Sequence, residues 1–170
     1  INFLWTTILF MKNLNIGKFT KKNKMSNIKI FCFGFGQVAK SFIKKVLFEE
    51  KKIELSATSR NKTYKNSLGK LNFNIYKFNN NEVDINIRRK IQEADYILVS
   101  IPPNNDQDIV IKNFESDLKK TKCKWITYLS ATSVYGDHKG EWVNERSETK
   151  PTSVYGVNRL QAENQWLKFS

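Results

Sequence analysis

A glycine-rich turn between an apolar run and an amphipathic segment constrains the fold of this chain more than any other feature. Residues 28–33 are apolar apart from one lysine and lead into Gly34-Phe35-Gly36-Gln37-Val38-Ala39, which fits the pattern G-x-G-x-x-A. Residues 37–50 then repeat apolar side chains at helical spacing. The sequence therefore predicts a buried strand, a tight turn and a helix, in that order.

The same alternation continues along the chain. Four further apolar runs predict strands, at residues 53–58, 74–78, 96–101 and 125–130. Helical periodicity predicts helices at residues 82–93, 106–120 and 151–169, whereas the polar residues 61–70 predict a loop. Near-continuous apolar strands that alternate with helices are typical of a parallel sheet covered on both faces. We expect an α/β fold, a Rossmann-like doubly wound parallel sheet.

Composition narrows the class of protein. The chain of 170 residues carries a net charge of +13, but only five of its 29 basic residues are Arg, and its Lys residues are scattered. Nucleic-acid readers favour Arg and concentrate their charge on one face, so we expect a solvated surface and no nucleic-acid partner. One His, His138, and two distant cysteines, Cys32 and Cys123, argue against a metal site and against a disulfide scaffold. We interpret both cysteines as small buried hydrophobes.

The first 24 residues differ from the rest. An apolar run, residues 1–10, precedes a Lys- and Asn-rich stretch without acidic residues, which reverses the order of a secretory signal. Ten apolar residues are also too few to span a bilayer. We interpret residues 1–24 as an upstream extension or disordered tail, rather than a membrane-surface anchor. Residues 25–170 form the folded domain, and we expect a cytoplasmic location with no membrane partner.

The glycine turn has the chemistry of a phosphate site. Gly34 allows the tight turn, Gly36 lets a pyrophosphate approach the backbone, and Ala39 is small enough for the helix to pack against the sheet. The free N–H groups of Phe35, Gly36, Gln37 and Val38 lie where a helix start favours an anion. The turn predicts a dinucleotide site, with a turn that binds no ligand as the alternative.

The end of the second predicted strand indicates which dinucleotide. Enzymes that bind NAD usually carry a carboxylate about 20 residues beyond the glycine turn. This chain has Thr58-Ser59-Arg60 there instead. A guanidinium pairs bidentately with a phosphate, whereas a carboxylate would repel it. Ser59 and Arg60 therefore favour NADP over NAD, the alternative being that Arg60 is a solvent-facing loop residue.

A hydroxyl-rich segment, residues 128–137, closes the last predicted strand, where open α/β sheets place their chemistry. Twenty residues past Tyr135 come Tyr155 and, four residues later, Arg159, which share one helical face. A neighbouring cation can lower the pKa of a phenol and make it a general acid or base. Taken alone, the pair would be better interpreted as a packed tyrosine beside a surface arginine.

Together these segments resemble the extended and atypical branches of the short-chain dehydrogenase/reductase superfamily, the NAD(P)-dependent epimerase/dehydratase group. The resemblance rests on the glycine turn, Ile101-Pro102-Pro103, residues 130–136, Trp142-Val143-Asn144-Glu145 and residues 155–163. It implies that Tyr155 is the catalytic tyrosine and Arg159 its basic partner. It implies further that Thr132 or Ser130 orients the substrate and that Ile101, Pro102 and Pro103 contact the cofactor.

The chain departs from the family pattern at two positions. Arg159 stands where family members usually have Lys, and the position of the family's catalytic serine falls on Ala131. Family members also continue past residue 170, so we expect a truncated product that lacks a C-terminal substrate portion and forms a homodimer in its full-length form. The expected function is an NAD(P)-dependent epimerase, dehydratase or reductase that acts on a nucleotide sugar or another small hydroxyl or carbonyl compound. The alternative is a non-catalytic NADP-binding sensor or scaffold.

Overall fold

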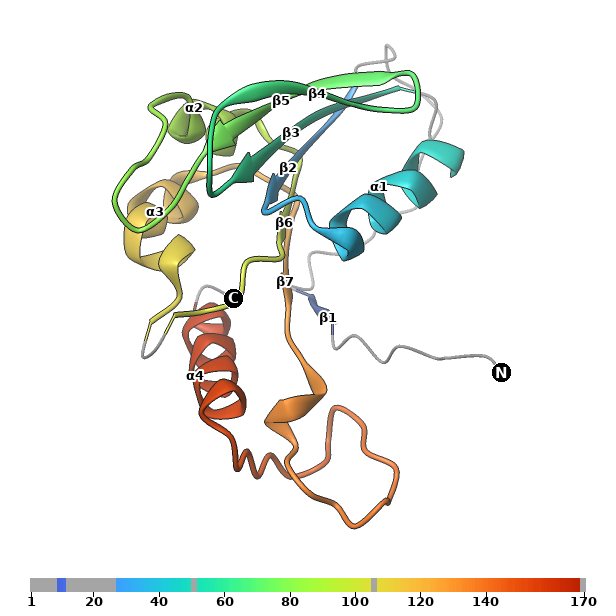
Figure 1. The fold of residues 1–170 in the computed structure, drawn as a ribbon, viewed down its shortest axis with the longest axis vertical. Helices are drawn as coiled ribbons and strands as arrows, with labels where there is room; N and C mark the ends of the chain where they lie inside the picture. The colour runs from blue at the N-terminus through green and yellow to red at the C-terminus, as the bar shows by residue number, and fades with distance from the viewer. Residues whose placement is uncertain (1–8, 12–26, 50–51, 105–106, 169–170) are drawn as a thin grey trace.

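A sheet of five parallel strands forms the centre of the molecule (Figure 1). The computed structural model describes residues 9–11, 27–49, 52–104 and 107–168. The parallel strands are β2 (Ile28–Phe33), β3 (Ile53–Ser59), β5 (Leu71–Lys77), β6 (Tyr96–Val99) and β7 (Trp125–Leu129). In the described part of the chain the sheet order is β1-β7-β6-β2-β3-β5-β4. The predicted doubly wound parallel sheet is therefore confirmed.

Two antiparallel strands flank these five. Strand β4 (Tyr64–Leu68) forms a hairpin with β5, so the predicted loop at residues 61–70 is wrong. A strand whose residues are mostly exposed and polar carries little apolar signal, and Gly69, at φ 61°, supplies the positive φ that a two-residue hairpin turn requires. Strand β1 (Leu9–Met11) pairs antiparallel with β7. The rest of the predicted tail, residues 1–24, lies outside the described residues.

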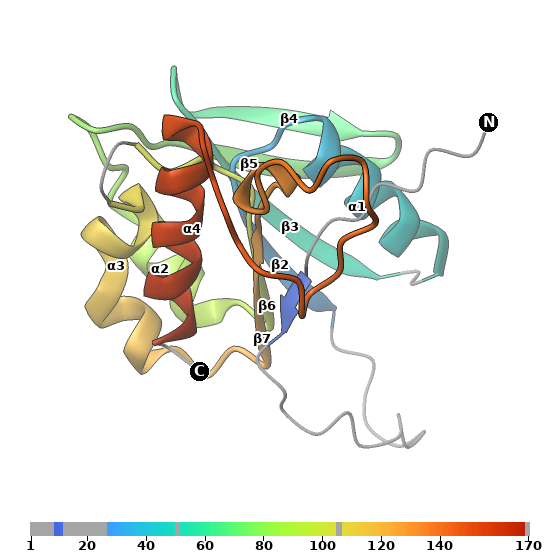
Figure 2. The same cartoon turned by 90° about the horizontal axis from the view of Figure 1, so that it is seen from below.

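Four α-helices cover the two faces of the sheet in the described part of the chain. Figure 2 shows α1 (Gln37–Glu49) on one face, with α2 (Asn86–Glu93), α3 (Ile109–Lys120) and α4 (Val154–Leu167) on the other. Alternate residues of a strand point to opposite faces, and β2 accordingly divides its side chains. Phe31 and Phe33 join the core beneath α2, α3 and α4, whereas Cys32 joins the core beneath α1. Complete burial raises the pKa of the Cys32 thiol to about 12, so its thiolate is disfavoured.

Side-chain caps move two helix starts later than predicted. Asp108 accepts hydrogen bonds from the N–H groups of Val110 and Ile111, at 2.8 and 3.1 Å, and so begins α3. Ser153 accepts from the N–H of Gly156 at 3.1 Å and so begins α4. None of the helices in the described part of the chain has the length and apolar character needed to cross a membrane.

The carboxyl ends of β2, β3 and β6 meet at one edge of the sheet, as parallel strands must. The link between β2 and β6 at this edge is direct, because both the N–H and the hydroxyl of Ser100 donate to Phe33 O, at 2.9 and 3.0 Å. The backbone turns that follow these strands are thereby held close together.

Candidate functional site

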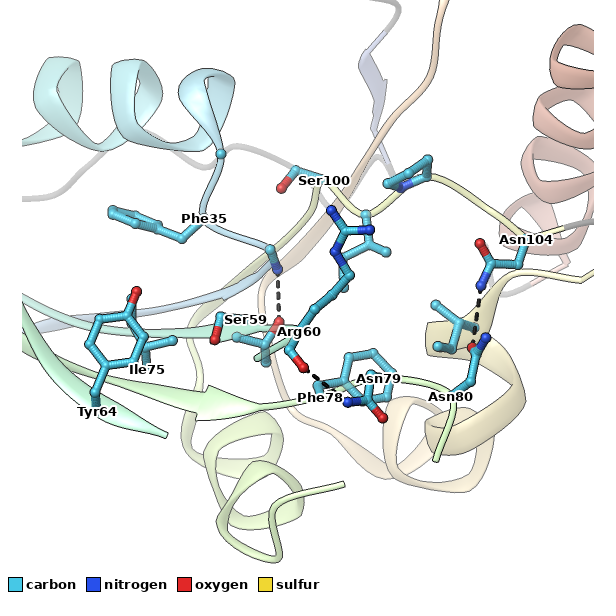
Figure 3. A pocket seen from close by; sticks show the side chains of 16 residues that line it. Phe35, Ser59, Arg60, Tyr64, Ile75, Phe78, Asn79, Asn80, Ser100 and Asn104 are labelled. Atoms are coloured by element: carbon cyan, nitrogen blue, oxygen red, sulfur yellow. Dashed lines mark hydrogen bonds between the residues drawn. The ribbon is translucent and has the colours of Figure 1, made fainter. Parts of the chain in front are cut away.

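A cavity of about 420 Å³ lies at the carboxyl ends of the parallel strands (Figure 3). It is lined by seven residues that the sequence predicts to bind a cofactor: Gly34, Phe35, Gly36, Ser59, Arg60, Ile101 and Pro102. Four other predicted residues lie outside its lining: Gln37, Val38, Ala39 and Pro103. The structure therefore brings the glycine turn, the end of β3 and the end of β6 into one concave site.

Gly34 is a glycine because the fold requires it. Its φ is 85°, and a Cβ there would lie 2.8 Å from the Ser100 hydroxyl oxygen. Its N–H donates to the hydroxyl of the buried Thr58 at 2.8 Å, which ties the turn to β3. Gly36 differs, because a Cβ there would meet no described atom within 4 Å. Gly36 also lines the cavity. Because it has no side chain, a ligand could approach its backbone closely.

The start of α1 supplies hydrogen-bond donors at the same place. The N–H of Lys40 donates to Gly36 O at 3.0 Å, so the helical hydrogen bonds begin at Gly36. The N–H groups of the four residues from Gly36 to Ala39 consequently have no partner within α1. The first turn carries no acidic side chain to neutralise the helix dipole. This end of the cavity therefore favours an anion.

Arg60 is the one charged side chain among the described residues that line the cavity. Figure 3 shows its guanidinium extending across the cavity toward Ser100. Its backbone is fixed, because the Asn79 amide donates to Arg60 O at 2.9 Å. No described lining residue carries a carboxylate that would neutralise Arg60. The Arg60 guanidinium and the N–H groups at the start of α1 thus meet no carboxylate in the described lining, which gives the cavity the electrostatics of a phosphate site.

The sequence pattern did not indicate several other lining residues. Tyr64 comes from the hairpin that the sequence predicts as a loop. Asn79 and Asn80 follow β5, and Asn104 follows β6. An asparagine that follows a strand belongs to no helical or strand periodicity. These three residues could have been predicted only if the ends of the strands had been placed correctly.

The candidate catalytic residues gather around the end of β7 instead. Thr132 lies on the short 3₁₀ helix η1 (Thr132–Val134), and Tyr155 lies in the first turn of α4. These two elements touch, since a Cβ on Gly156 would lie 2.5 Å from Ser133 O. Tyr155 is 85% exposed, and neither Tyr155 nor Thr132 lines the cavity. Their catalytic roles stay predictions.

Arg159 contacts a different tyrosine from the one that the sequence spacing pairs with it. Its guanidinium donates to the Tyr128 hydroxyl at 3.1 Å and to Leu129 O at 2.9 Å. Burial raises the pKa of Tyr128 to about 12, although the Arg159 charge acts in the opposite direction. Tyr128 precedes Arg159 by 31 residues, so helical spacing could not reveal this contact. Arg159 thus links α4 to β7.

Glu163 lies one turn further along α4 and is a buried carboxyl group. Only 5% of the residue is exposed, and its Oε1 has no hydrogen-bond partner among the described residues. Burial raises the pKa of Glu163, while the nearby Ser130 hydroxyl and the Arg159 charge pull it down. Ser130, one of the predicted substrate-orienting residues, therefore lies beside a buried acid.

Glu163→Gln should change how stability depends on pH. A carboxyl whose pKa is raised in the folded state contributes stability below its unfolded pKa of about 4.3, and this contribution is lost as pH rises through the folded value. The free energy of unfolding of the wild type, relative to Glu163→Gln, should therefore fall as pH rises from about 4 to 7. Urea denaturation at several pH values measures the difference, and a difference independent of pH would contradict the prediction.

Comparison with known proteins gives matches among solved structures alone. No protein-family model matches this chain, and no curated protein matches it. The solved structures include a UDP-glucuronic acid 4-epimerase from Bacillus cereus in complex with NAD, with 20% identity and a TM-score of 0.64, covering 84% of this chain and 52% of that chain. The chain shares its fold with nucleotide-sugar epimerases. Its resemblance to the epimerase/dehydratase group of the short-chain dehydrogenase/reductase superfamily is confirmed at the level of the fold.

Two further structures show the same relation. A dTDP-glucose 4,6-dehydratase from Bacillus anthracis in complex with NAD has 16% identity and a TM-score of 0.60, covering 84% of this chain and 50% of that chain. A conserved protein of unknown function from Silicibacter pomeroyi has 24% identity and a TM-score of 0.65, covering 84% and 50%. The chain therefore spans about half the length of the solved proteins that it matches.

Among the described residues, no group of three or more His, Cys, Asp or Glu could hold a metal ion.

Proposed function

We propose that this chain binds NADP and forms the cofactor-binding part of an epimerase, dehydratase or reductase. Its substrate would be a nucleotide sugar or another small compound with a hydroxyl or carbonyl group. The observation that carries the proposal is the cavity in which the glycine turn faces Arg60 and no described carboxylate. Its volume, about 420 Å³, falls within the range of roughly 300–1,000 Å³ typical of ligand pockets.

The residues present fit a dinucleotide with a 2′-phosphate. The open side of Gly36 and the unpartnered N–H groups at the start of α1 suit the pyrophosphate. Arg60 follows β3, at the place where the adenosine ribose is recognised in this fold. The UDP-glucuronic acid 4-epimerase and the dTDP-glucose 4,6-dehydratase are both in complex with NAD, so the choice of NADP rests on this chain's own Arg60.

We propose the following roles for the residues around β7. A nicotinamide cofactor held by the glycine turn and Arg60 would supply hydride chemistry at a substrate carbon. Tyr155 gives or takes the proton at the substrate oxygen, and Thr132, on the adjacent element η1, donates a second hydrogen bond to that oxygen. Arg159 positions α4 through Tyr128 and places a positive charge one helical turn from Tyr155. Ser130, which directly follows β7, lies next to these residues.

Arg60→Ala should weaken NADP binding by roughly 1–3 kcal/mol, the scale of a lost charge-assisted contact, and leave NAD binding nearly unchanged. Titration of both dinucleotides by calorimetry measures the two affinities. Arg146→Ala is the matched control, because Arg146 is exposed and lies outside the cavity lining. Tighter binding of NAD than of NADP by the unmodified protein would contradict the cofactor assignment.

A second candidate function is an NADP-binding sensor or scaffold without turnover. Two observations favour it: Ala131 occupies the position of the family's serine, and Arg159 donates to Tyr128 and Leu129 rather than to Tyr155. Both candidates require the same cofactor cavity. They differ in hydride transfer, which a labelled cofactor detects directly.

A further inference from the structure

The connection between β3 and β4 is fixed in place beside the cavity. This connection, residues 59–64, is held in the middle by the Asn79 amide, which donates to Arg60 O at 2.9 Å. Near its end the Thr63 hydroxyl donates to a carboxylate oxygen of Asp84 at 2.7 Å. Although burial raises the pKa of Asp84, hydrogen bonds from Thr63 and Asn86 lower it overall, so the anchoring carboxylate is charged at neutral pH. The connection is therefore anchored at the Arg60 carbonyl and at the Thr63 hydroxyl.

Tyr64 begins β4 and faces the cavity. It stands directly opposite Ile75 in the antiparallel register of the hairpin, and both residues line the cavity. Figure 3 shows the Tyr64 ring beside Ile75, with its hydroxyl directed toward Phe35 and the glycine turn. Among the described residues, nothing hydrogen-bonds the Tyr64 hydroxyl. Its O–H is therefore available as a donor inside the site.

A second positive charge lies over the Tyr64 ring. The ammonium group of Lys62 is 5.9 Å from the centroid of the Tyr64 ring. The Ser59 hydroxyl donates to Lys62 O at 2.9 Å and so closes the turn of residues 59–62. Arg60 and Tyr64 thus bring one cation and one neutral donor to the cavity, and Lys62, outside the cavity lining, adds a second positive charge beside the Tyr64 ring. A phosphate dianion suits this combination, whereas a ribose hydroxyl would leave the positive charge of Arg60 without a counter-charge.

We propose that Tyr64 is a specificity-determining residue, which donates a hydrogen bond to the 2′-phosphate of the adenosine ribose that Arg60 pairs with. Lys62 contributes charge to the same phosphate. This inference rests on the proposed function and deepens it, because it gives the hairpin a role in selecting NADP. A loop in place of β4 would not hold the Tyr64 ring opposite Ile75 in the wall of the cavity.

Two isomeric probes test the inference: adenosine 2′,5′-bisphosphate and adenosine 3′,5′-bisphosphate, which carry equal charge. Calorimetry should show that the unmodified chain prefers the 2′,5′ isomer. Tyr64→Phe should weaken binding of the 2′,5′ isomer roughly tenfold, the scale of one hydrogen bond to a charged group, and change binding of the 3′,5′ isomer less than about twofold. Tyr96→Phe is the matched control, because Tyr96 begins β6 at the amino end of the strand and lies outside the cavity lining.

The outcomes separate the inference from the function on which it rests. If Tyr64→Phe weakens both isomers equally, or neither, Tyr64 does not select the 2′-phosphate and the inference is overturned. If the unmodified chain binds neither isomer, the proposed function fails as well. Lys62→Gln should weaken the 2′,5′ isomer alone, whereas Lys65→Gln, one residue along β4, should not. Equal thermal midpoints for Tyr64→Phe and wild type would show that the variant is folded.

Discussion

Replacing Asp108 with Ala should lower the free energy of unfolding by about 2–4 kcal/mol. Asp108 is 1% exposed, and its side chain accepts hydrogen bonds from two parts of the fold. It caps α3 through the N–H groups of Val110 and Ile111, and it accepts a hydrogen bond from the Trp166 indole at 3.1 Å. Losing a cap costs about 1 kcal/mol, and losing the buried hydrogen bond between the indole and the carboxylate costs roughly 1–3 kcal/mol more. Urea denaturation near neutral pH measures the loss.

Two variants separate these contributions. Ser153→Ala removes a cap alone, at the start of α4, and should cost about 1 kcal/mol. Asp108→Asn keeps an acceptor oxygen, and it removes a charge whose burial raises the pKa of Asp108, so it should cost less than Asp108→Ala. If Asp108→Ala cost no more than Ser153→Ala, the link to Trp166 would contribute nothing. The hydrogen bond between Asp108 and Trp166 joins the cavity to α4. Ile109, next to Asp108, lines the cavity, and Trp166 belongs to α4.

The parallel sheet could be predicted because its central strands β2, β3 and β6 are largely buried. Burial on both faces demands near-continuous apolar runs, and residues 28–33 and 96–99 show such runs. Strand β4 could not be predicted in this way, because one neighbouring strand and an exposed face leave its sequence, Tyr64–Leu68, mostly polar. Its pairing follows from the turn at Gly69 and from the register with β5, which are properties of the folded hairpin.

The residues that line the cavity could be predicted where the pattern that indicates them is local in the sequence. The glycine turn and Arg60 act at fixed distances along the chain from strand ends, so spacing alone places them in one site. The contacts of Arg159 are different. Its partner Tyr128 comes from β7, and the side chain reaches across the interface between a helix and a strand. Spacing of four residues places Tyr155 and Arg159 on one face of α4, yet it does not determine which group the guanidinium contacts.

Tyr155→Phe should lower hydride transfer from the cofactor by roughly 10²–10⁴-fold, the usual contribution of a general acid or base. Tyr155 is exposed in the first turn of α4, beside the helix η1 that carries Thr132. A substrate oxygen lying against these two elements would meet a proton donor and a second hydrogen-bond donor together. Ala131 supplies no hydroxyl, and one missing donor to a developing oxyanion costs roughly 3–4 kcal/mol, so transfer by the unmodified protein should itself be slow or restricted in substrate.

Isotope exchange from labelled NADPH measures this transfer, with a panel of carbonyl compounds and nucleotide sugars as acceptors. Tyr96→Phe serves again as the control, since it removes a phenol hydroxyl at the opposite end of the sheet. Equal rates for wild type and Tyr155→Phe would exclude Tyr155 as the acid or base. If neither protein transferred hydride while both still bound NADPH, Arg60 and the glycine turn would serve recognition alone. The contacts of Arg159 with Tyr128 and Leu129 would then belong to a nucleotide sensor in which the tyrosine of α4 has no proton to move.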